Sequence, residues 1–174
     1  MRRALGLGLL LLLLGCSGGW DGLLFSFESE AELDQFRWKC GQLFRLCPEH
    51  ATHGRHSLRL EIYPAAYSGL RPAITRRDWS GFQAFCLDVY NPQREALRLS
   101  VRIDDARNRY EFADRYNRSF RLAPGLNRIR IPLSALVTSG TGRRLDTQDI
   151  WAVYIFLAHP QEMKVLYFDY LRLE

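Results

Sequence analysis

The alternation of apolar and polar residues is clearest in the middle of the chain, over residues 96–132. Every second residue from Leu97 to Ile103 is apolar, and the residues between them are polar or charged. A period of two indicates a strand with one buried face. A loop rich in Asp, Asn, Arg and Tyr follows, and strands are predicted at 119–122 and 126–131 with a Pro-Gly turn between them. The segment therefore predicts a half-buried sheet that ends in a charged, aromatic loop, a place to hold a polar ligand.

Short strand patterns recur on both sides of this segment. Strands are predicted at 23–27, 36–39, 58–63, 70–75, 83–90, 151–157 and 165–173. The segment 83–90 is apolar on both faces, which predicts a central strand. Pro72 places its own strand at a sheet edge, because proline cannot donate a ladder hydrogen bond. About ten short strands with turns between them predict an all-β fold, an antiparallel sandwich or barrel.

Helical signals are limited to single turns. Ser29, with Glu32 three residues later, forms a capping box, and this predicts a helical turn over 30–35. A second turn is predicted at 133–136. No long helical period or internal repeat is present, so helices are expected only as connections.

The N-terminus differs from the rest of the chain. Residues 1–3 carry two arginines, and the apolar run 5–14 is too short to span a bilayer. The run ends in Leu-Leu-Gly-Cys16, which resembles the bacterial lipobox. That resemblance implies a signal peptide at 1–15, a lipidated Cys16 with a tether at 16–22, and one domain at 23–174. Ser17 implies sorting to the outer membrane; a secretory signal with a chance cysteine is the alternative.

Composition and charge fit a single globular domain. The 174 residues suit one domain, with 13% aromatic and 25% charged residues. The net charge is +5, but basic and acidic residues are interleaved, so no nucleic-acid partner is expected.

The cysteines and histidines suggest a disulfide and no zinc site. Cys40 and Cys47 flank a six-residue segment, which predicts a hairpin disulfide in an oxidising compartment. Cys86 lies within a strand and is predicted to be a buried thiol. Three histidines at 50, 53 and 56 fall in a loop and are expected to be solvated.

Several short motifs occur in an order typical of one family. They are Phe27-Glu28, Ser57-Leu58-Arg59-Leu60-Glu61, Asp78-Trp79-Ser80-Gly81-Phe82, Leu87-Asp88-Val89-Tyr90-Asn91-Pro92, Pro124-Gly125-Leu126-Asn127 and Tyr167-Phe168-Asp169-Tyr170-Leu171. Together they resemble the galactose-binding-like jelly rolls of bacterial carbohydrate-binding modules, and a similar domain appended to some VanZ-type membrane proteins. The resemblance implies two packed antiparallel sheets and a glycan on the concave sheet or at a loop end. It also implies a structural calcium ion between the first and last strands, at Glu28 and Asp169.

Alternation also predicts a candidate binding face opposite the core. Its members are Asp88, Tyr90, Arg102, Asp104, Tyr154 and Phe156, with Tyr110 and Arg118 from the charged loop. Aromatic rings stack on the C–H faces of sugars, and planar polar groups pair with hydroxyls. The alternative is that the aromatic residues form a second core layer and Asp88 pairs with Arg102. Asp104, Asp105, Asp114 and Asn117 near the loop either bind calcium or form an Arg–Asp network.

Three functions remain open on sequence alone. A glycan- or polysaccharide-binding lipoprotein, anchored to the membrane, is favoured because the sequence has no nucleophile motif, phosphate loop or zinc signature. A protein–protein interaction module on the same fold is the alternative. A small glycan hydrolase, which would need a pair of carboxylates, is the third.

Overall fold

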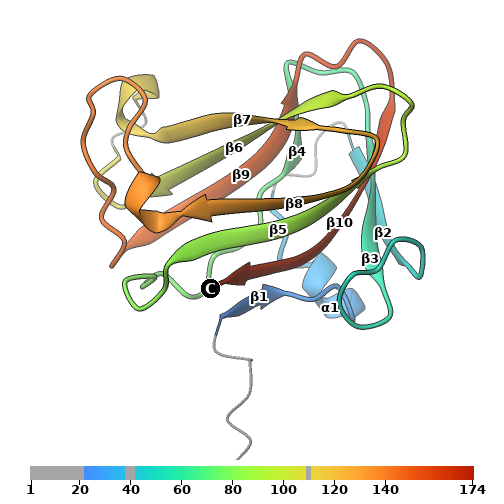
Figure 1. Cartoon of the computed structure of the whole chain (residues 1–174), viewed down its shortest axis with the longest axis horizontal. Helices are drawn as coiled ribbons and strands as arrows, with labels where there is room; N and C mark the ends of the chain where they lie inside the picture. The colour runs from blue at the N-terminus through green and yellow to red at the C-terminus, as the bar shows by residue number, and fades with distance from the viewer. Residues whose placement is uncertain (1–21, 38–41, 109–110) are drawn as a thin grey trace, which may run out of the picture.

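Two antiparallel β-sheets are stacked face to face in the computed structural model, which describes residues 22–37, 42–108 and 111–174 (Figure 1). The strands are β1 (Leu23–Phe25), β2 (Gln42–Cys47), β3 (Ser57–Ile62), β4 (Tyr67–Leu70), β5 (Ala84–Asn91), β6 (Leu97–Asp105), β7 (Tyr116–Leu122), β8 (Gly125–Pro132), β9 (Ile150–Ala158) and β10 (Lys164–Leu173). The predicted all-β sandwich with a jelly-roll architecture is confirmed.

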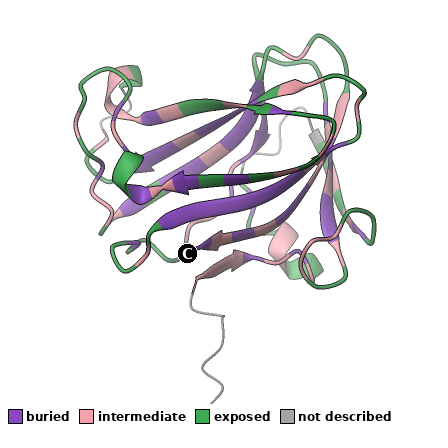
Figure 2. Ribbon diagram, in the orientation of Figure 1, coloured by how far each residue is buried: buried purple, intermediate pink, exposed green. Residues whose placement is uncertain are grey.

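The strands divide into a sheet of six and a sheet of four. The larger sheet has the order β2-β3-β10-β5-β8, with β1 beside β10, and the smaller sheet has the order β4-β9-β6-β7. The core lies between them and includes Trp79, whose ring stacks on Phe85 at 5.5 Å. Figure 2 shows that almost every residue of β5 is buried. This strand is central, as its two apolar faces predict.

Three short helical segments connect the strands. They are α1 (Glu30–Leu33) and the 3-10 turns η1 (Phe112–Asp114) and η2 (Leu133–Ala135). The predicted helical turn forms at Glu30–Leu33, but its N-terminal hydrogen bonds differ from those of a reciprocal capping box. Ser29 Oγ accepts from the Ala31 amide, and the Glu32 carboxylate accepts from the amides of Ser26, Phe27 and Glu28. In the described ranges, no helix is both long and apolar enough to cross a membrane.

The predicted 96–132 sheet is divided between the two layers. β6 and β7 pair with each other in the smaller sheet, whereas β8 pairs with β5 in the larger one. The Pro124–Gly125 turn therefore carries the chain from one sheet to the other, and Gly125 adopts a φ of +91° there. Alternation along a strand gives its buried face but not its partner strand, so the sequence pattern did not separate β8 from β7.

The predicted Cys40–Cys47 disulfide is not found. Cys47 is a free, buried thiol whose sulfur lies 3.6 Å from Ser57 Oγ, and Cys40 lies outside the described residues. The segment expected to be a hairpin loop is the extended strand β2, paired along its length with β3. A six-residue strand covers roughly 16 Å between its ends, whereas disulfide-bonded Cα atoms lie within about 7 Å.

Candidate ligand-binding cleft

A cleft of about 440 Å³ opens on the outer face of the smaller sheet, the face turned away from the core. Its lining residues come from all four strands, from the β6–β7 connection and from the segment after α1. They are Arg37, Tyr67, Arg71, Ser100, Arg102, Phe112, Arg115, Asn117, Tyr154, Phe156 and Ala158. Natural ligand sites have volumes of about 300–1,000 Å³, so the cleft is large enough for a small oligomer or a segment of a polymer.

Strand register explains why the residues of the cleft floor meet. Arg102 on β6 lies opposite Tyr154 on β9 and Asn117 on β7. Two residues along the strand, Ser100 lies opposite Phe156 on one side and Ser119 on the other. Since residues i and i+2 share a face, these two rows lie side by side on the outer surface.

Two guanidinium groups contact the ring of Tyr154. The Cζ atom of Arg102 lies 4.5 Å from the ring centroid, and that of Arg71 lies 5.1 Å from it. At the next row, Tyr67 meets the buried ring of Phe156 edge to face at 5.6 Å and remains 54% exposed. Cation–π and edge-to-face contacts fix ring orientation, so the aromatic part of the cleft is preformed.

Asp104 lies behind Arg102 and does not line the cleft. Its carboxylate is buried and accepts two hydrogen bonds from Arg102, from Nε to Oδ1 at 2.9 Å and from Nη2 to Oδ2 at 2.5 Å. This bidentate pair neutralises both charges and holds the guanidinium under Tyr154.

The wall of the cleft comes from the β6–β7 connection. Arg115 lies over the exposed ring of Phe112, with 4.3 Å between Cζ and the ring centroid. Arg115 Nε and Asn117 Oδ1 are buried, and neither has a hydrogen-bond partner among the described residues. Burial, with a smaller effect of nearby Arg102, lowers the pKa of Arg115. Buried polar atoms without partners are costly, so these two atoms are candidates for contact with a ligand.

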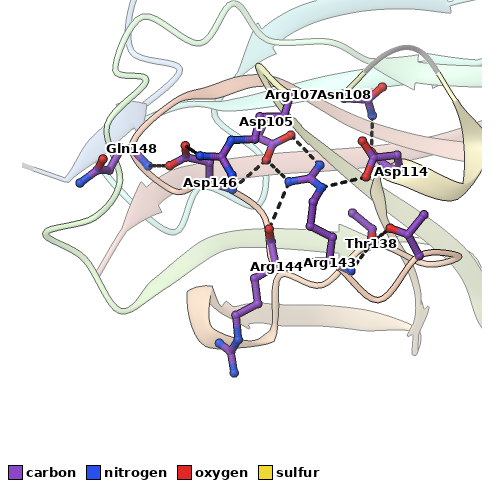
Figure 3. Close-up of polar contacts among 10 residues, drawn as sticks. Asp105, Arg107, Asn108, Asp114, Thr138, Arg143, Arg144, Asp146 and Gln148 are labelled. Carbon is purple, nitrogen blue, oxygen red and sulfur yellow. Dashed lines mark hydrogen bonds and ion pairs between the residues drawn. The ribbon is translucent and has the colours of Figure 1, made fainter.

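An Arg–Asp network ties this wall to the sandwich (Figure 3). Arg143 lies between two carboxylates: Nη1 and Nη2 donate to Asp105 at 2.6 and 3.0 Å, and Nε donates to Asp114 at 2.9 Å. The Asp146 amide donates to Asp105 at 2.7 Å. Burial of Asp105 would raise its pKa, but Arg143 and the Asp146 amide outweigh it, so the pKa is lowered. Of the two sequence interpretations, the network is the one observed for Asp105 and Asp114.

The predicted binding face is split between the two sheets. Arg102, Tyr154 and Phe156 lie together in the cleft, with Asp104 behind them. Asp88 and Tyr90 lie on β5 in the other sheet. Asp88 is therefore not the partner of Arg102.

On that other sheet, Asp88 and Tyr90 already have contacts of their own. The buried Asp88 carboxylate lies 3.4 Å from Arg172 Nη1 and 3.7 Å from Arg128 Nε. The ring of Tyr90 stacks on His50 at 3.5 Å.

Other predicted residues lie elsewhere or outside the described chain. Arg118 is opposite the core-facing Val101, so it points to the inner side of edge strand β7, where its guanidinium lies 5.3 Å from the Phe120 ring centroid. Tyr110 and Cys16 are outside the described residues.

Sequence reasoning missed much of the cleft lining. Ser100 and Asn117 share the outward face with Arg102, so alternation and pairing contain the signal for them. Tyr67 was missed because β4 begins earlier than the predicted strand at 70–75, and Arg71 was missed because it directly follows β4 instead of lying within a strand. Arg37 lies in the segment predicted as a strand at 36–39, which has only an isolated bridge at Phe36. Phe112 and Arg115 come from a connection whose path no periodicity indicates.

Glu28 and Asp169, the positions predicted for calcium, both bind the loop before β3. Glu28 Oε1 accepts from the amides of Arg55 and His56 at 2.7 and 2.6 Å. Asp169 Oδ2 accepts from the amides of Thr52 and His53 at 2.5 and 2.8 Å, and Oδ1 from its neighbour Tyr170. These donors occupy oxygens that a cation would need. In the described chain no group of three or more His, Cys, Asp or Glu residues could hold a metal ion. The residues present therefore do not fit calcium as arranged.

The pKa directions of these two carboxyl groups differ. Burial raises the pKa of Asp169 despite its amide donors. For Glu28, burial acts in the same direction, but the amides of Arg55 and His56 outweigh it and lower the pKa.

Comparisons with known proteins identify the fold through solved structures. No protein-family model and no curated protein matches the sequence. The family 11 carbohydrate-binding module of Clostridium thermocellum, solved with a β-1,3-1,4-mixed-linked tetrasaccharide, matches with a TM-score of 0.67 and 14% identity, over 87% of this chain and 94% of that one. An exo-β-agarase matches with a TM-score of 0.65 and 16% identity over 88% of this chain, which spans only 24% of the agarase.

A third match is to a xylanase from Clostridium thermocellum. Its CBM22-1 and GH10 modules, complexed with xylohexaose, match with a TM-score of 0.57 and 8% identity, over 88% of this chain and 28% of that one. At these identities the likeness is one of fold. The structural neighbours of this chain thus include carbohydrate-binding modules with the same β-sandwich.

Proposed function

We propose that this domain binds a glycan or polysaccharide in the cleft and does not cleave it. The observation that carries the proposal is the cleft itself, in which aromatic rings, guanidinium groups, a hydroxyl and an amide converge on one sheet face. Sugars present C–H faces to aromatic rings and hydroxyl pairs to planar polar groups, so this set of side chains suits them. The fold shared with modules solved in complex with oligosaccharides supports the same function.

The lining chemistry favours binding over hydrolysis. Glycosidases use two carboxyl groups that flank the scissile bond. No carboxylate is among the described lining residues, and the nearest acid on the same face, Asp104, is held by Arg102. The described lining therefore lacks the pair of carboxyl groups that a glycan hydrolase would need.

We further propose that Cys16 is lipidated and anchors the domain to the cell envelope, with the outer membrane favoured. The lipobox-like sequence and Ser17 support this location. Residues 17–22 would then join the anchor to β1. A tethered binding domain would hold polysaccharide near the membrane surface.

Two tyrosines on different sheets provide the test. Tyr154→Ala should abolish retention of the protein in native gels that contain the polysaccharide it recognises. Tyr90→Ala, on the other sheet, serves as the matched control and should leave retention unchanged. The proposal fails if the wild-type chain binds no glycan on an array of neutral and anionic polysaccharides, and also if the two variants lose retention equally. A partner recovered by crosslinking without any glycan binding would favour the interaction module instead.

A further inference from the structure

Arginines in the cleft differ from half-buried arginines elsewhere in the protein. Six described arginines are half-buried: Arg59, Arg71, Arg102, Arg115, Arg143 and Arg172. Four of them pair with carboxylates, namely Glu61, Asp104, Asp105 and Asp88. The two that have no ion pair with any described residue are Arg71 and Arg115, and both line the cleft.

Among the half-buried arginines of the described chain, the only ones without a counter-charge are in the cleft. The exposed Arg37 is a third lining arginine without an ion pair in the described chain, and none of the described lining residues is acidic. A desolvated guanidinium without a counter-charge is unfavourable, so a protein normally supplies a carboxylate, as this one does at Asp105. The planar fork of arginine matches the geometry of carboxylate and sulfate groups. A bound anion would supply the missing partner.

In Arg115, a single buried atom lacks the partner that a bound anion would supply. Its buried Nε has no hydrogen-bond partner among described residues, although its Cζ atom lies over the Phe112 ring. The positive charge of Arg102 lies close enough to lower the pKa of Arg115 further. An anionic group at this position would accept from Nε and reduce the repulsion between the two guanidinium groups.

We propose that the ligand is an anionic polysaccharide, whose uronate or sulfate groups bind Arg71 and Arg115 while a sugar ring contacts Tyr154. This inference rests on the proposed function, because it specifies the ligand of the same cleft. Arg71 contacts the Tyr154 ring directly, so an anionic group bound to Arg71 would lie next to a sugar ring bound to Tyr154.

A second hollow favours a polymer over a single sugar. It measures about 180 Å³ and shares Arg37 and Arg71 with the cleft. Its lining also includes Trp151, which is 45% exposed and lies 5.0 Å from the guanidinium of Arg77. Each hollow therefore has an aromatic residue in its lining, and the two share two arginines that have no ion pair in the described chain.

The test compares anionic with neutral polymers. The full chain, purified in detergent, is run in native gels that contain polygalacturonate, dextran sulfate or neutral dextran, at several salt concentrations. Retention by either anionic polymer and not by dextran is expected, and the choice between the two anions identifies carboxylate or sulfate. Arg115→Gln and Arg71→Gln should each weaken binding by about tenfold or more, as loss of a charge-assisted pair does.

Arg121→Gln is the matched control. Arg121 lies on the outward face of β7, exposed and outside the cleft, so this variant removes the same charge without changing the lining. Equal loss in Arg121→Gln and Arg115→Gln would overturn the inference, because it would indicate general attraction to a basic surface. Tyr154-dependent binding of a neutral glycan, unchanged in Arg115→Gln, would overturn the inference and leave the proposed function intact. Binding of no polysaccharide at all would remove both.

Discussion

Arg102 binds Asp104 through two parallel hydrogen bonds, and this pair separates a residue that lines the cleft from one that lies behind it. Asp104 is 3% exposed, and both of its carboxylate oxygens accept hydrogen bonds from Arg102. It therefore positions Arg102 and has no free oxygen directed at a ligand. The sequence had predicted both residues as ligand contacts. In the structure Arg102 lines the cleft, whereas Asp104 lies behind it and holds the Arg102 guanidinium in place.

Asp104→Asn should therefore lower stability. The amide cannot neutralise Arg102, and breaking a buried pair from one side costs about 3–5 kcal/mol. We expect a loss near 3 kcal/mol, since Arg102 keeps part of its surface in water. Urea unfolding measures it. Asp149→Asn is the control, because its pair with Arg77 is exposed on both sides and should contribute less than about 1 kcal/mol. Equal effects of the two variants would contradict the assignment.

The lowered pKa of Asp105 predicts that the stability of the fold depends on pH. Its folded pKa is lowered, so the stability it contributes is fully present above its unfolded pKa of about 3.9 and is lost as pH falls through the folded pKa. Asp105→Asn should therefore be less stable than wild type at pH 7, and the difference should shrink below about pH 4. Chemical unfolding at pH 7, 5 and 3 tests this, and a difference that stays constant across these pH values would refute it.

The same ion network should also affect binding. Arg143 joins β6 to η1, which carries Phe112, so Arg143→Ala should leave Asp105 buried without its partner and release the wall of the cleft. We expect a loss of about 3 kcal/mol in stability and weaker glycan retention. Arg144→Ala is the neighbouring control, since Arg144 is exposed and its side chain donates to the Ser134 carbonyl without forming an ion pair in the described chain. If Arg143→Ala is destabilised but keeps full glycan retention, the network does not support the cleft and this prediction is wrong.

Calcium should not be needed for stability. The carboxylates of Glu28 and Asp169 accept hydrogen bonds from backbone amides, which a cation would have to displace. Excess EGTA is therefore expected to leave the Tm unchanged. A fall in Tm, reversed by added Ca²⁺, would restore the calcium prediction that the family resemblance implies.

The sequence predicted strands well and their neighbours poorly. Periodicity located β5 and β6 almost to the residue, because burial on one or both faces is written in the local pattern. The binding face required knowing that β6 pairs with β9 and that β5 lies in the other sheet, which depends on long-range packing. Arg115 could not be predicted, since its position is set by a loop that Arg143 holds from far along the chain.

The anchor is tested by Cys16→Ser. If Cys16 is lipidated, wild type should partition into detergent phase and migrate as a processed species, whereas the variant should be released or remain unprocessed. Metabolic labelling with a clickable fatty acid provides a direct readout. Ser17→Asp tests the location, because it should move the protein toward the inner membrane if the sorting rule applies. Unlabelled wild type would exclude the lipoprotein interpretation.

A substitution at Phe112 tests whether this residue contacts the ligand without contributing to the core. Its ring is 65% exposed, at the wall of the cleft, and its described aromatic contact is with the Arg115 guanidinium. A large apolar ring left in water contributes little to folding, so Phe112→Ser should change stability by less than about 1 kcal/mol. It should nevertheless weaken polysaccharide retention, because the cleft loses a sugar-stacking surface and Arg115 loses its support.

Two variants define the limits of this test. Leu43→Ala removes a side chain of matched exposure, 62%, from the other sheet and should alter neither stability nor retention. Phe156→Ala removes a ring that is 8% exposed and should cost about 3–5 kcal/mol, as buried aromatic residues do. Thermal melts and affinity electrophoresis on the three variants measure both properties. Full retention by Phe112→Ser would exclude this wall from the binding site and confine recognition to the sheet surface around Tyr154.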